Sequence, residues 1–512
     1  MLSRVISSAT LGVDAYTVEV EADIQQQLPG FITVGLPDGA LKESKERVTA
    51  AIKNSDFMFP SKRVTINLAP ADIRKEGSAF DLPIAMGILA ATGQILSDRC
   101  DEFVMLGELS LDGALRSVPG VLPMAMNLNG DRGIRGMIVP KLNAREAAIG
   151  TSIPVYPVNS LQEAVHFLED ESSIRQFSVD VDSVFNAAYN YSIDFADVKG
   201  QESAKRALEV AAAGGHNIVM IGPPGSGKTM LARRMPTILP DMALGEALET
   251  TKIHSVAGRL PTDCGLVATR PFRAPHHSIS YAGLIGGGAI PKPGEVSLSH
   301  NGVLFLDELP EFKKDILEML RQPMEDNHVT ISRAALTLSY PAGFTLIAAM
   351  NPCPCGYYGD PGHECNCSTS EIQRYMSRVS GPLMDRIDIH ITVPSVKFRD
   401  LSSDTRGEQS AVIRQRVNCA RQKQIERFKS EKNIFCNAHM ESRDIRRYCK
   451  IDDKSRSLLA TAINRQGLSA RAYDRILKVS RTIADLAECD NIELGHIAEG
   501  IHYRTLDRRL WM

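Results

Sequence analysis

Over its first 170 residues the chain alternates short hydrophobic runs with polar segments. Hydrophobic and polar residues alternate over residues 15–22, as in a strand with one buried face, and strand-like runs follow at residues 63–67 and 103–106. Residues 82–90 are almost continuously apolar, as in a buried helix. The pattern predicts an α+β or α/β domain over residues 1–170.

The pattern changes twice along the rest of the chain. Residues 171–193 are polar and acidic without a clear period, which predicts a linker. A second α/β segment follows over residues 194–395. Residues 396–512 lack proline and carry Arg, Lys, Ala and Leu at helical spacing, which predicts a helical domain.

A glycine-rich loop between a predicted strand and a predicted helix is the strongest local signal. An apolar run at residues 218–221 precedes Gly-Pro-Pro-Gly-Ser-Gly-Lys-Thr, which matches the phosphate-binding pattern G-x-x-x-x-G-K-[ST] in full. Backbone N–H groups of such a loop converge on phosphate oxygens, while its lysine contacts the β- and γ-phosphates and its threonine binds Mg²⁺. A plain glycine-rich turn is the weaker alternative. The predicted nucleotide contacts are Gly222, Pro223, Pro224, Gly225, Ser226, Gly227, Lys228, Thr229 and Met230.

Two further buried runs end in polar side chains suited to ATP hydrolysis. The run at residues 302–306 ends in Asp307, which is placed to hold Mg²⁺, and Glu308, which is placed to polarise the attacking water. A helix N-cap after a strand is the alternative for this pair. The run at residues 344–350 ends in Asn351, an amide suited either to the γ-phosphate or to a turn before the following proline. Two carboxylates favour hydrolysis over nucleotide binding alone.

Four of the ten cysteines lie close together in two Cys-x-Cys pairs. Thiolates at this spacing can bind Zn²⁺ tetrahedrally, and His363 is an alternative ligand. Reduced buried thiols or a redox pair would also account for the cluster. A closed four-ligand site would be structural. The predicted zinc ligands are Cys353, Cys355, Cys365 and Cys367.

Charge and hydropathy restrict the choice of partners. The chain has 58 basic and 61 acidic residues, so binding to nucleic acid requires a local basic surface. Nine basic residues outnumber four acidic ones between Lys397 and Lys429, although a solvated helix face is the commoner cause of such runs. The N-terminus lacks a signal-peptide core, and the longest apolar stretch is too short to span a bilayer. The sequence predicts a cytoplasmic protein without a membrane partner.

Together these motifs resemble the AAA+ ATPases, in particular the branch that holds the magnesium-chelatase ATPase subunit, the MCM helicases and the ComM/YifB family. Residues 197–201 resemble the segment that lies against the adenine, and Asn351 resembles sensor 1. Arg386 resembles an arginine finger that reaches a neighbouring subunit, although a surface salt bridge would also account for it. Arg471 resembles sensor 2.

The resemblance to the ComM/YifB family covers nearly the whole chain. It implies an α/β AAA+ core with an N-terminal Lon-protease-like α+β domain and a C-terminal helical lid. Ala79 and Leu122 stand where the Lon serine and lysine are expected, so the resemblance implies an inactive protease domain. A shifted alignment would restore Ser78 as a nucleophile but not the lysine.

The same resemblance indicates where DNA would be contacted. In the related helicases a hairpin before sensor 1 and an inserted loop project into the channel of a ring. The alternation over residues 329–340 predicts that hairpin here, with Arg333 at a backbone phosphate, or else an ordinary exposed hairpin. In the second loop, His276 and His277 are either pore residues or satisfied loop histidines.

The family implies a ring, expected to be a hexamer, that uses ATP and Mg²⁺. Its expected work is DNA unwinding or branch migration, during recombination in natural transformation. A chelatase-type motor that remodels a partner protein remains an alternative. An ATP-dependent protease is the third possibility, and the missing Ser-Lys pair weighs against it.

Overall fold

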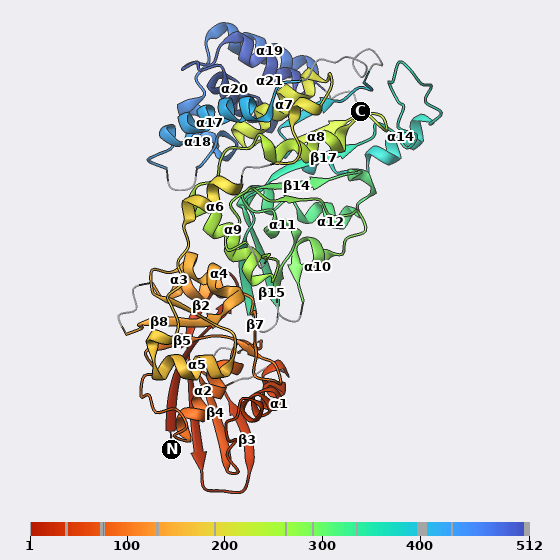
Figure 1. The fold of residues 1–512 in the computed structure, drawn as a ribbon. Coiled ribbons are helices and arrows are strands. Elements are labelled where there is room, and N and C mark those ends of the chain that lie inside the picture. Colours follow the sequence, from red (N-terminus) through yellow and green to blue (C-terminus); the bar gives the residue numbers. More distant parts are fainter. Residues whose placement is uncertain are drawn as a thin grey trace. The chain divides into compact units, whose positions relative to one another are not determined.

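The chain folds into two compact units, each described separately below (Figure 1). The first comprises Met1–Ala187, Leu244–Ala268 and Ser332–Tyr340, and the second comprises Ala188–Ala243, Thr269–Ile331 and Pro341–Met512. The structure is a computed structural model. It describes residues 2–35, 39–71, 75, 77–129, 133–188, 191–261, 264–288, 291–333, 336–396, 407–431 and 434–505.

A mixed seven-stranded sheet forms the centre of the first unit, in the order β3-β4-β2-β1-β5-β8-β9. Strand β2 runs antiparallel to β1 and β4, and the other neighbours are parallel. The predicted strands at residues 15–22, 63–67 and 103–106 are thereby confirmed. The strands of this unit are β1 (Leu2–Leu11), β2 (Asp14–Gln25), β3 (Gly30–Val34), β4 (Arg63–Ala69), β5 (Phe103–Met105), β6 (Glu108–Leu109), β7 (Leu115–Arg116), β8 (Gly136–Pro140) and β9 (Val155–Val158).

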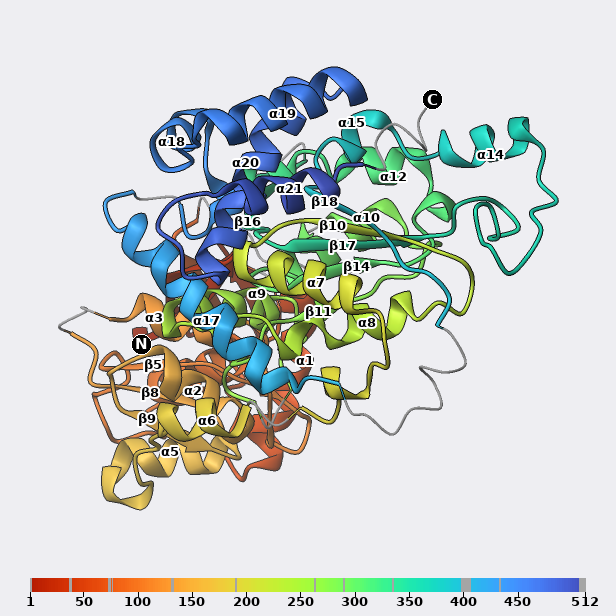
Figure 2. The same ribbon diagram turned by 90° about the horizontal axis from the view of Figure 1, so that it is seen from above.

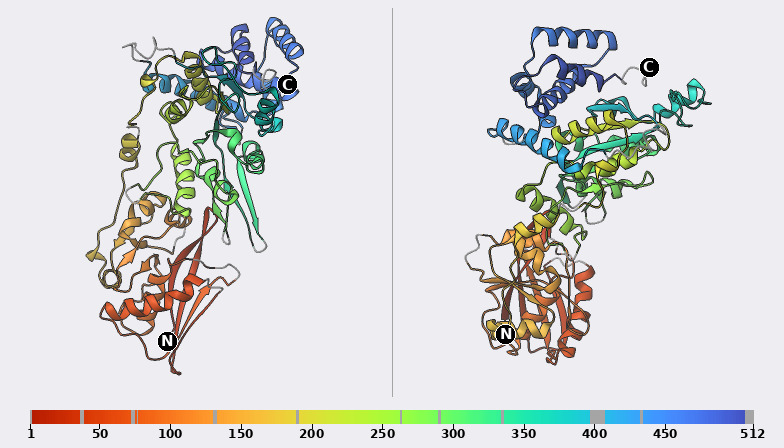
Figure 3. Two further views of the ribbon diagram at one scale, coloured as in Figure 1. Left: turned by 90° about the vertical axis from the view of Figure 1, so that its right-hand side faces the viewer. Right: turned by 45° about the horizontal axis from the view of Figure 1, so that its top comes forward.

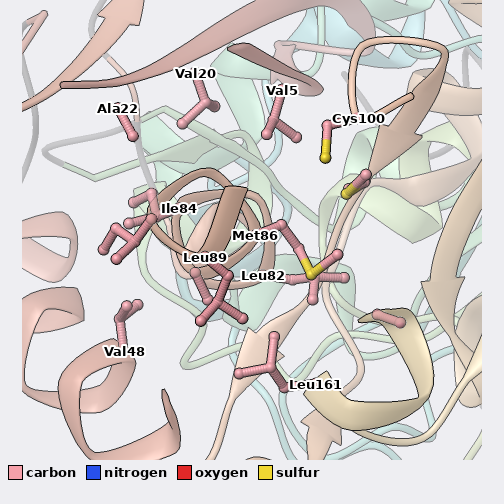
Figure 4. Packing of buried hydrophobic residues seen from close by; sticks show 14 of the residues in the cluster. Val5, Val20, Ala22, Val48, Leu82, Ile84, Met86, Leu89, Cys100 and Leu161 are labelled. Carbon is pink, nitrogen blue, oxygen red and sulfur yellow. The ribbon is translucent and has the colours of Figure 1, made fainter. Parts of the chain in front are cut away.

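Helix α2 is buried on nearly all sides, as its apolar sequence predicts. Figure 4 shows its Leu82 and Met86 among side chains from the sheet, such as Val5, and from helix α1, such as Val48. The helices of the first unit are α1 (Gly39–Asn54), α2 (Asp81–Ala91), α3 (Val121–Asn127), α4 (Ala144–Gly150), α5 (Leu161–Glu169) and α9 (Leu244–Val256), with short 3₁₀ turns at Lys141–Asn143 and Glu171–Ser173.

Two features of the chain differ from the simple order of segments expected from sequence. Helix α6 (Val181–Ala188) forms inside the segment predicted to be a linker. Helix α9 follows the glycine-rich loop in sequence but packs against α3 in the first unit. The units are therefore not contiguous in sequence.

A five-stranded parallel sheet organises the second unit, in the order β11-β14-β17-β10-β18. Every residue of its three central strands is buried, which accounts for their continuously apolar sequences. Since the strands are parallel, the polar residues that follow them meet at one edge. The strands are β10 (Ile218–Ile221), β11 (Phe272–Arg273), β14 (Val303–Leu306), β17 (Thr345–Met350) and β18 (Ile389–Thr392).

Helices surround this sheet, and the C-terminal segment is helical as predicted. Helices α17 and α20 pack against α7 (Figure 2). The helices are α7 (Glu202–Gly214), α8 (Lys228–Arg234), α10 (Tyr281–Leu284), α11 (Glu295–Leu298), α12 (Lys314–Met319), α13 (Pro323–Asp326), α14 (Thr369–Met376), α15 (Gly381–Met384), α17 (Ser410–Arg427), α18 (Ser442–Tyr448), α19 (Asp453–Gln466), α20 (Ala470–Leu486) and α21 (Leu494–His502), with 3₁₀ turns at Phe195–Asp197, Met235–Thr237, Leu309–Glu311 and Asn437–His439.

Two small ribbons complete the fold. Strands β12 (Gly286–Gly287) and β13 (Lys292–Pro293) pair antiparallel in the segment between β11 and α11. Strands β15 (His328–Arg333) and β16 (Leu336–Pro341) form a longer two-stranded ribbon, drawn in green in Figure 3. The ribbon confirms the hairpin expected over residues 329–340.

A buried carboxylate ties the helical segment to the sheet. Asp388, which precedes β18, forms an ion pair with Arg475 of α20 and accepts a hydrogen bond from the backbone N–H of Asn217 at 3.1 Å. Its other neighbour is His216, at 3.4 Å. Burial opposes ionisation, but Arg475 and His216 hold the pKa of Asp388 well below its usual range. Helix α20 is thus joined to the start of both β18 and β10.

Within the described part of the chain, no helix has the length and apolar character needed to cross a membrane.

Candidate active site

The loop after β10 folds around the ammonium group of Lys228. Its Nζ donates hydrogen bonds to the carbonyl oxygens of Gly222 (2.7 Å) and Pro223 (2.9 Å). Gly227 has a φ of +85°, a left-handed conformation that favours glycine, and α8 begins at the next residue. Burial lowers the pKa of Lys228, and the carboxylate of Asp307 opposes that shift. The loop therefore concentrates one positive charge at the carboxyl edge of the sheet.

Thr229 and Asp307 meet beside this lysine. The hydroxyl of Thr229 donates a hydrogen bond to Oδ2 of Asp307 at 2.6 Å. Thr229 lies in the first turn of α8, which follows β10, and Asp307 follows β14, so the carboxyl edge of the parallel sheet brings the two together. Hydroxyl and carboxylate oxygens are ligands suited to Mg²⁺. The structure thus brings together the two residues expected to hold this ion.

Asn351 reaches the same place from the strand between them. Strand β17 pairs with β10 so that Met350 lies opposite Ile221, and each strand then ends. The next residue, Asn351, accepts a hydrogen bond from Nζ of Lys228 through Oδ1 at 3.2 Å. An amide at this position contacts the group that is expected to bind the phosphates.

Glu308 follows Asp307 and lies against a histidine from the segment after β11. Arg273 of β11 is opposite Leu304 of β14, and the segment after β11 carries His277 to Glu308, which follows β14. Nδ1 of His277 lies 3.4 Å from Oε2 of Glu308. The start of this segment is fixed because Arg273 binds Glu295 through two contacts of 2.5 and 2.7 Å. His277, which sequence alone left as a pore or loop histidine, is therefore a neighbour of the expected catalytic carboxylate.

Arg386 is nearly buried and has a partner within its own chain. Its Nη2 lies 2.7 Å from Oε1 of Glu325, and its Nη1 donates to the carbonyl oxygen of Pro382 at 2.9 Å. The side chain of Glu325 is half exposed. Contact of Arg386 with a neighbouring subunit would require Arg386 to exchange this carboxylate for a phosphate.

Arg471 lies in the first turn of α20 and is exposed. Over the residues that the structure describes, no hydrogen bond or ion pair joins Arg471 to the loop around Lys228. The structure therefore brings four sequence-predicted side chains together, those of Lys228, Thr229, Asp307 and Asn351, with Glu308 directly beside them.

The four cysteines of the Cys-x-Cys pairs form one cluster. Their sulfur atoms lie within 4.8 Å of one another, and the distances among the Sγ atoms of Cys353, Cys355 and Cys365 are 3.3 to 3.7 Å. A tetrahedral zinc site with Zn–S bonds of about 2.3 Å places its sulfurs about 3.8 Å apart. Hydrogen bonds from the N–H of Tyr357 and the thiol of Cys353 lower the pKa of Cys355 to about 6, whereas burial and the neighbouring cysteines raise the pKa values of Cys365 and Cys367. Residues and geometry both fit zinc.

His363, the alternative zinc ligand, lies outside this cluster of sulfurs. Its Nδ1 is 3.4 Å from Oδ2 of Asp360, and its ring stacks on that of Tyr357 with the centroids 4.7 Å apart. The sulfur cluster itself contains only the four cysteines.

Several arginines of the basic run predicted on α17 form ion pairs or hydrogen bonds within the chain. Arg416 binds Glu209 at 2.6 Å, and Arg427 binds Asp485 at 2.5 Å. Arg421 donates to two backbone carbonyl oxygens of α7. Lys397, Arg399 and Arg406, which belong to the same basic run, lie outside the described residues. Arg333 ends β15 with an exposed side chain.

In the first unit, the two positions that resemble the Lon catalytic pair are apolar and buried. Ala79 and Leu122 belong to the core, and the backbone N–H of Leu122 donates to the buried carboxylate of Glu146 at 2.9 Å. Ser78 donates a short hydrogen bond to Glu108. The nearby serine is therefore held by a carboxylate.

Comparison with known proteins agrees with this arrangement. Residues 194–401 match the family model "Magnesium chelatase, subunit ChlI", residues 407–504 match its C-terminal model, and residues 20–143 match "Subunit ChlI of Mg-chelatase". Competence protein ComM of Haemophilus influenzae is 45% identical over 99% of this chain and 98% of its own length. The chain belongs to the ComM/YifB family. Within that family, YifB of Escherichia coli is 44% identical with the same coverage, and a protein of Mycobacterium tuberculosis is 40% identical over 99% of both chains.

Membership in the ComM/YifB family makes the chain an AAA+ ATPase related to magnesium chelatase, and the family implies ATP and Mg²⁺ as its cofactors. The AAA+ match covers the parallel sheet and the loop around Lys228.

Proposed function

We propose that the chain forms a ring, a hexamer, that hydrolyses ATP to move on DNA as a helicase or branch-migration motor. Its task is recombination during natural transformation. One observation supports the proposal. The side chains suited to ATP hydrolysis meet at one edge of the sheet, in a chain that is similar over nearly its whole length to a competence protein.

In this proposal each residue at the sheet edge has a role in ATP hydrolysis. Lys228 neutralises phosphate charge, and Thr229 and Asp307 hold Mg²⁺, which offsets the charge of the β- and γ-phosphates when bound. Glu308 orients the attacking water. Asn351, already in contact with Lys228, is placed to sense the γ-phosphate. Positioning and charge stabilisation of this kind account for most of the catalysis in phosphoryl transfer.

Two arginines extend the site beyond these residues. Arg386 acts as a finger in trans, because a guanidinium near the γ-phosphate stabilises the charge that develops there. This role requires a ring in which each subunit supplies Arg386 to its neighbour. Arg471, exposed at the start of α20, acts as sensor 2 from the lid.

DNA contact is assigned to the β15–β16 ribbon. Arg333 is exposed at its end, and a phosphate contact requires only a well-placed cation. Because α17 uses much of its basic charge internally, the ribbon is a better candidate for DNA contact than that helix.

The chelatase-like family models favour a second candidate, a motor that remodels a partner protein. The ATPase rate decides between the two. It should rise on addition of single-stranded, duplex or branched DNA, and a three- or four-stranded substrate should be resolved only with ATP. An assembled, ATP-hydrolysing ring that no DNA form binds or stimulates would exclude the DNA motor and favour a protein substrate. Cleavage of an unfolded protein such as casein would instead indicate the protease.

A further inference from the structure

We propose that a zinc ion bound by Cys353, Cys355, Cys365 and Cys367 supports the phosphate-binding loop, so that loss of the metal weakens nucleotide binding. The metal would act through Gly356, which lies against Pro224. This inference rests on the proposed function only in taking the loop around Lys228 as the ATP site.

The contact between the cysteine segment and the loop is close. Gly356 has a φ of +87°, and a Cβ added to it would lie 2.5 Å from Cδ and 2.8 Å from Cγ of Pro224. Such distances are far inside van der Waals contact, so only a glycine allows the two segments to approach this closely. Pro224 is the third residue of the predicted phosphate-binding loop. The backbone at Gly356 therefore forms part of the packing surface of that loop.

The cysteines hold Gly356 in this position. The backbone N–H of Gly356 donates to Sγ of Cys353 at 3.2 Å, and that of Cys355 donates to Sγ of Cys367 at 3.4 Å. Metal-bound sulfurs are commonly held by such hydrogen bonds, which orient the ligands and the backbone together. The turn that meets Pro224 is thus built on the same sulfurs that would bind zinc.

A second contact joins the same short segment to the loop. Asn351 accepts a hydrogen bond from Nζ of Lys228, and Cys353, fully buried, follows two residues later. The segment from Asn351 to Gly356 therefore contacts the phosphate-binding loop at both of its ends. A change in the cluster would be transmitted to Lys228 and to Pro224.

The two halves of the cysteine segment differ in burial, because Pro352, Cys353 and Gly356 are buried whereas the second Cys-x-Cys pair lies among exposed residues. Residues 361–364 and 368–370 are exposed, so the second Cys-x-Cys pair lies in a segment without an apolar core. Small segments of this kind depend on a metal for their fold, because binding energy replaces the missing hydrophobic energy. Removal of the metal should therefore free the second pair and break the hydrogen bond from the N–H of Cys355 to Sγ of Cys367, which steadies the turn at Gly356.

The test measures zinc content and nucleotide affinity of the full chain. Zinc is measured by mass spectrometry after purification without added metal, and affinity by fluorescence anisotropy of a fluorescent ATP analogue with Mg²⁺. Cys365→Ser removes a ligand that belongs to the second Cys-x-Cys pair, outside the segment from Asn351 to Gly356 that contacts the loop. It should lose its zinc and bind the analogue about tenfold more weakly, which corresponds to about 1.4 kcal/mol. Cys264→Ser, at an exposed cysteine outside the cluster, should change neither quantity.

Two glycine variants distinguish the effect of the contact with Pro224 from the effect of losing the metal. Gly356→Ala retains all four ligands but places a Cβ against Pro224, so it should keep zinc and bind the analogue several-fold more weakly. Gly359→Ala is the matched control, because Gly359 has a similar φ of +78° but no neighbouring atom within 4 Å of an added Cβ. It should keep both zinc and normal affinity.

Normal nucleotide affinity in a zinc-free Cys365→Ser chain would overturn the proposal, as would equal affinities of Gly356→Ala and Gly359→Ala. Treatment of the unaltered chain with a chelator gives an independent measurement. Affinity should fall and should return with Zn²⁺ but not with Mg²⁺ alone. If DNA does not stimulate the ATPase rate, the DNA motor is contradicted but the role of zinc is not. If the zinc-loaded chain does not bind nucleotide, both the proposed function and the role of zinc are overturned.

Discussion

The imidazole of His277 lies against the carboxylate of Glu308, with Nδ1 3.4 Å from Oε2. His277 comes from the segment after β11, and Glu308 from the loop after β14, so the contact joins two neighbouring strands of the parallel sheet. A carboxylate that must aim a water molecule benefits from a neighbour that limits its rotation.

Replacement of His277 should therefore slow hydrolysis without weakening ATP binding. We expect His277→Ala to lower kcat about five- to tenfold, with KM for ATP within about twofold of the unaltered chain, as is typical when an interaction specific to the transition state is lost. His276→Ala is the comparison, because His276 hydrogen-bonds Ser278 and packs its ring on that of His277, with the ring centroids 4.0 Å apart, so it tests the support of His277. Equal losses in the two variants would show that the segment matters only as a scaffold.

Replacement of Lys228 and replacement of Glu308 should impair ATP hydrolysis in different ways. Lys228→Ala removes the charge that holds the phosphates and should weaken nucleotide binding. Glu308→Gln keeps the nucleotide contacts but loses the carboxylate, so it should bind ATP normally and hydrolyse it at least about a hundredfold more slowly. Equilibrium binding and single-turnover hydrolysis distinguish the two. Hydrolysis by Glu308→Gln at the normal rate would show that another group activates the water.

Arg386 should act across a subunit boundary. Subunits with Arg386→Ala and subunits with Lys228→Ala should each be nearly inactive alone. Mixed rings should recover part of the ATPase rate, because some interfaces pair an intact loop with an intact arginine. Glu325→Gln removes only the partner of Arg386 within the chain and should remain active. Mixed rings that co-assemble but stay inactive would contradict a role in trans.

Asp388 should contribute to stability at neutral pH. Because its pKa in the fold lies well below the usual value, its contribution is complete above a pH of about 4 and is lost as the pH falls further. Asp388→Asn leaves Arg475 without its buried partner, so it should reduce the free energy of unfolding at pH 7 by about 3 kcal/mol. The difference in the free energy of unfolding between the unaltered chain and Asp388→Asn should become smaller as the pH falls below about 4. Asp453→Asn, at an exposed carboxylate, is the control in thermal unfolding from pH 3 to pH 8.

Arg333 should matter only when DNA is present. Arg333→Ala should reduce stimulation of the ATPase by DNA while basal hydrolysis is unchanged. The stimulation itself should decline with salt, because phosphate contacts release counterions. Measurement of the ATPase rate at several salt concentrations, with and without DNA, checks both statements. Undiminished stimulation of Arg333→Ala by DNA would show that another part of the chain contacts the DNA.

The local signals of the sequence identified the strands, the buried helix α2 and the phosphate-binding loop, because each depends on residues that are close in the chain. Strand order depends on long-range pairing and was not accessible in this way. The position of β17 between β10 and β14 brings Asn351 to Lys228, and no sequence period encodes it.

The sequence also did not show which side chains contact one another in the fold. The basic run on α17 resembled a nucleic-acid surface, but the acids that bind Arg416 and Arg427 lie far away in sequence, at Glu209 and Asp485. His277 could be recognised only from the folded chain, in which the segments that follow β11 and β14 bring it beside Glu308. In both cases the decisive neighbour comes from another element of the fold.

The ion pair between Asp388 and Arg475 also limits how the ATPase can move. It lies between Arg386, two residues upstream on one side, and Arg471, one helical turn earlier on the other. A tilt of α20 must therefore carry the start of β18 with it or break a buried ion pair. In the proposed ring, Asp388 would therefore couple a movement of α20, which carries the proposed sensor Arg471, to Arg386, the arginine proposed to reach the neighbouring ATP site.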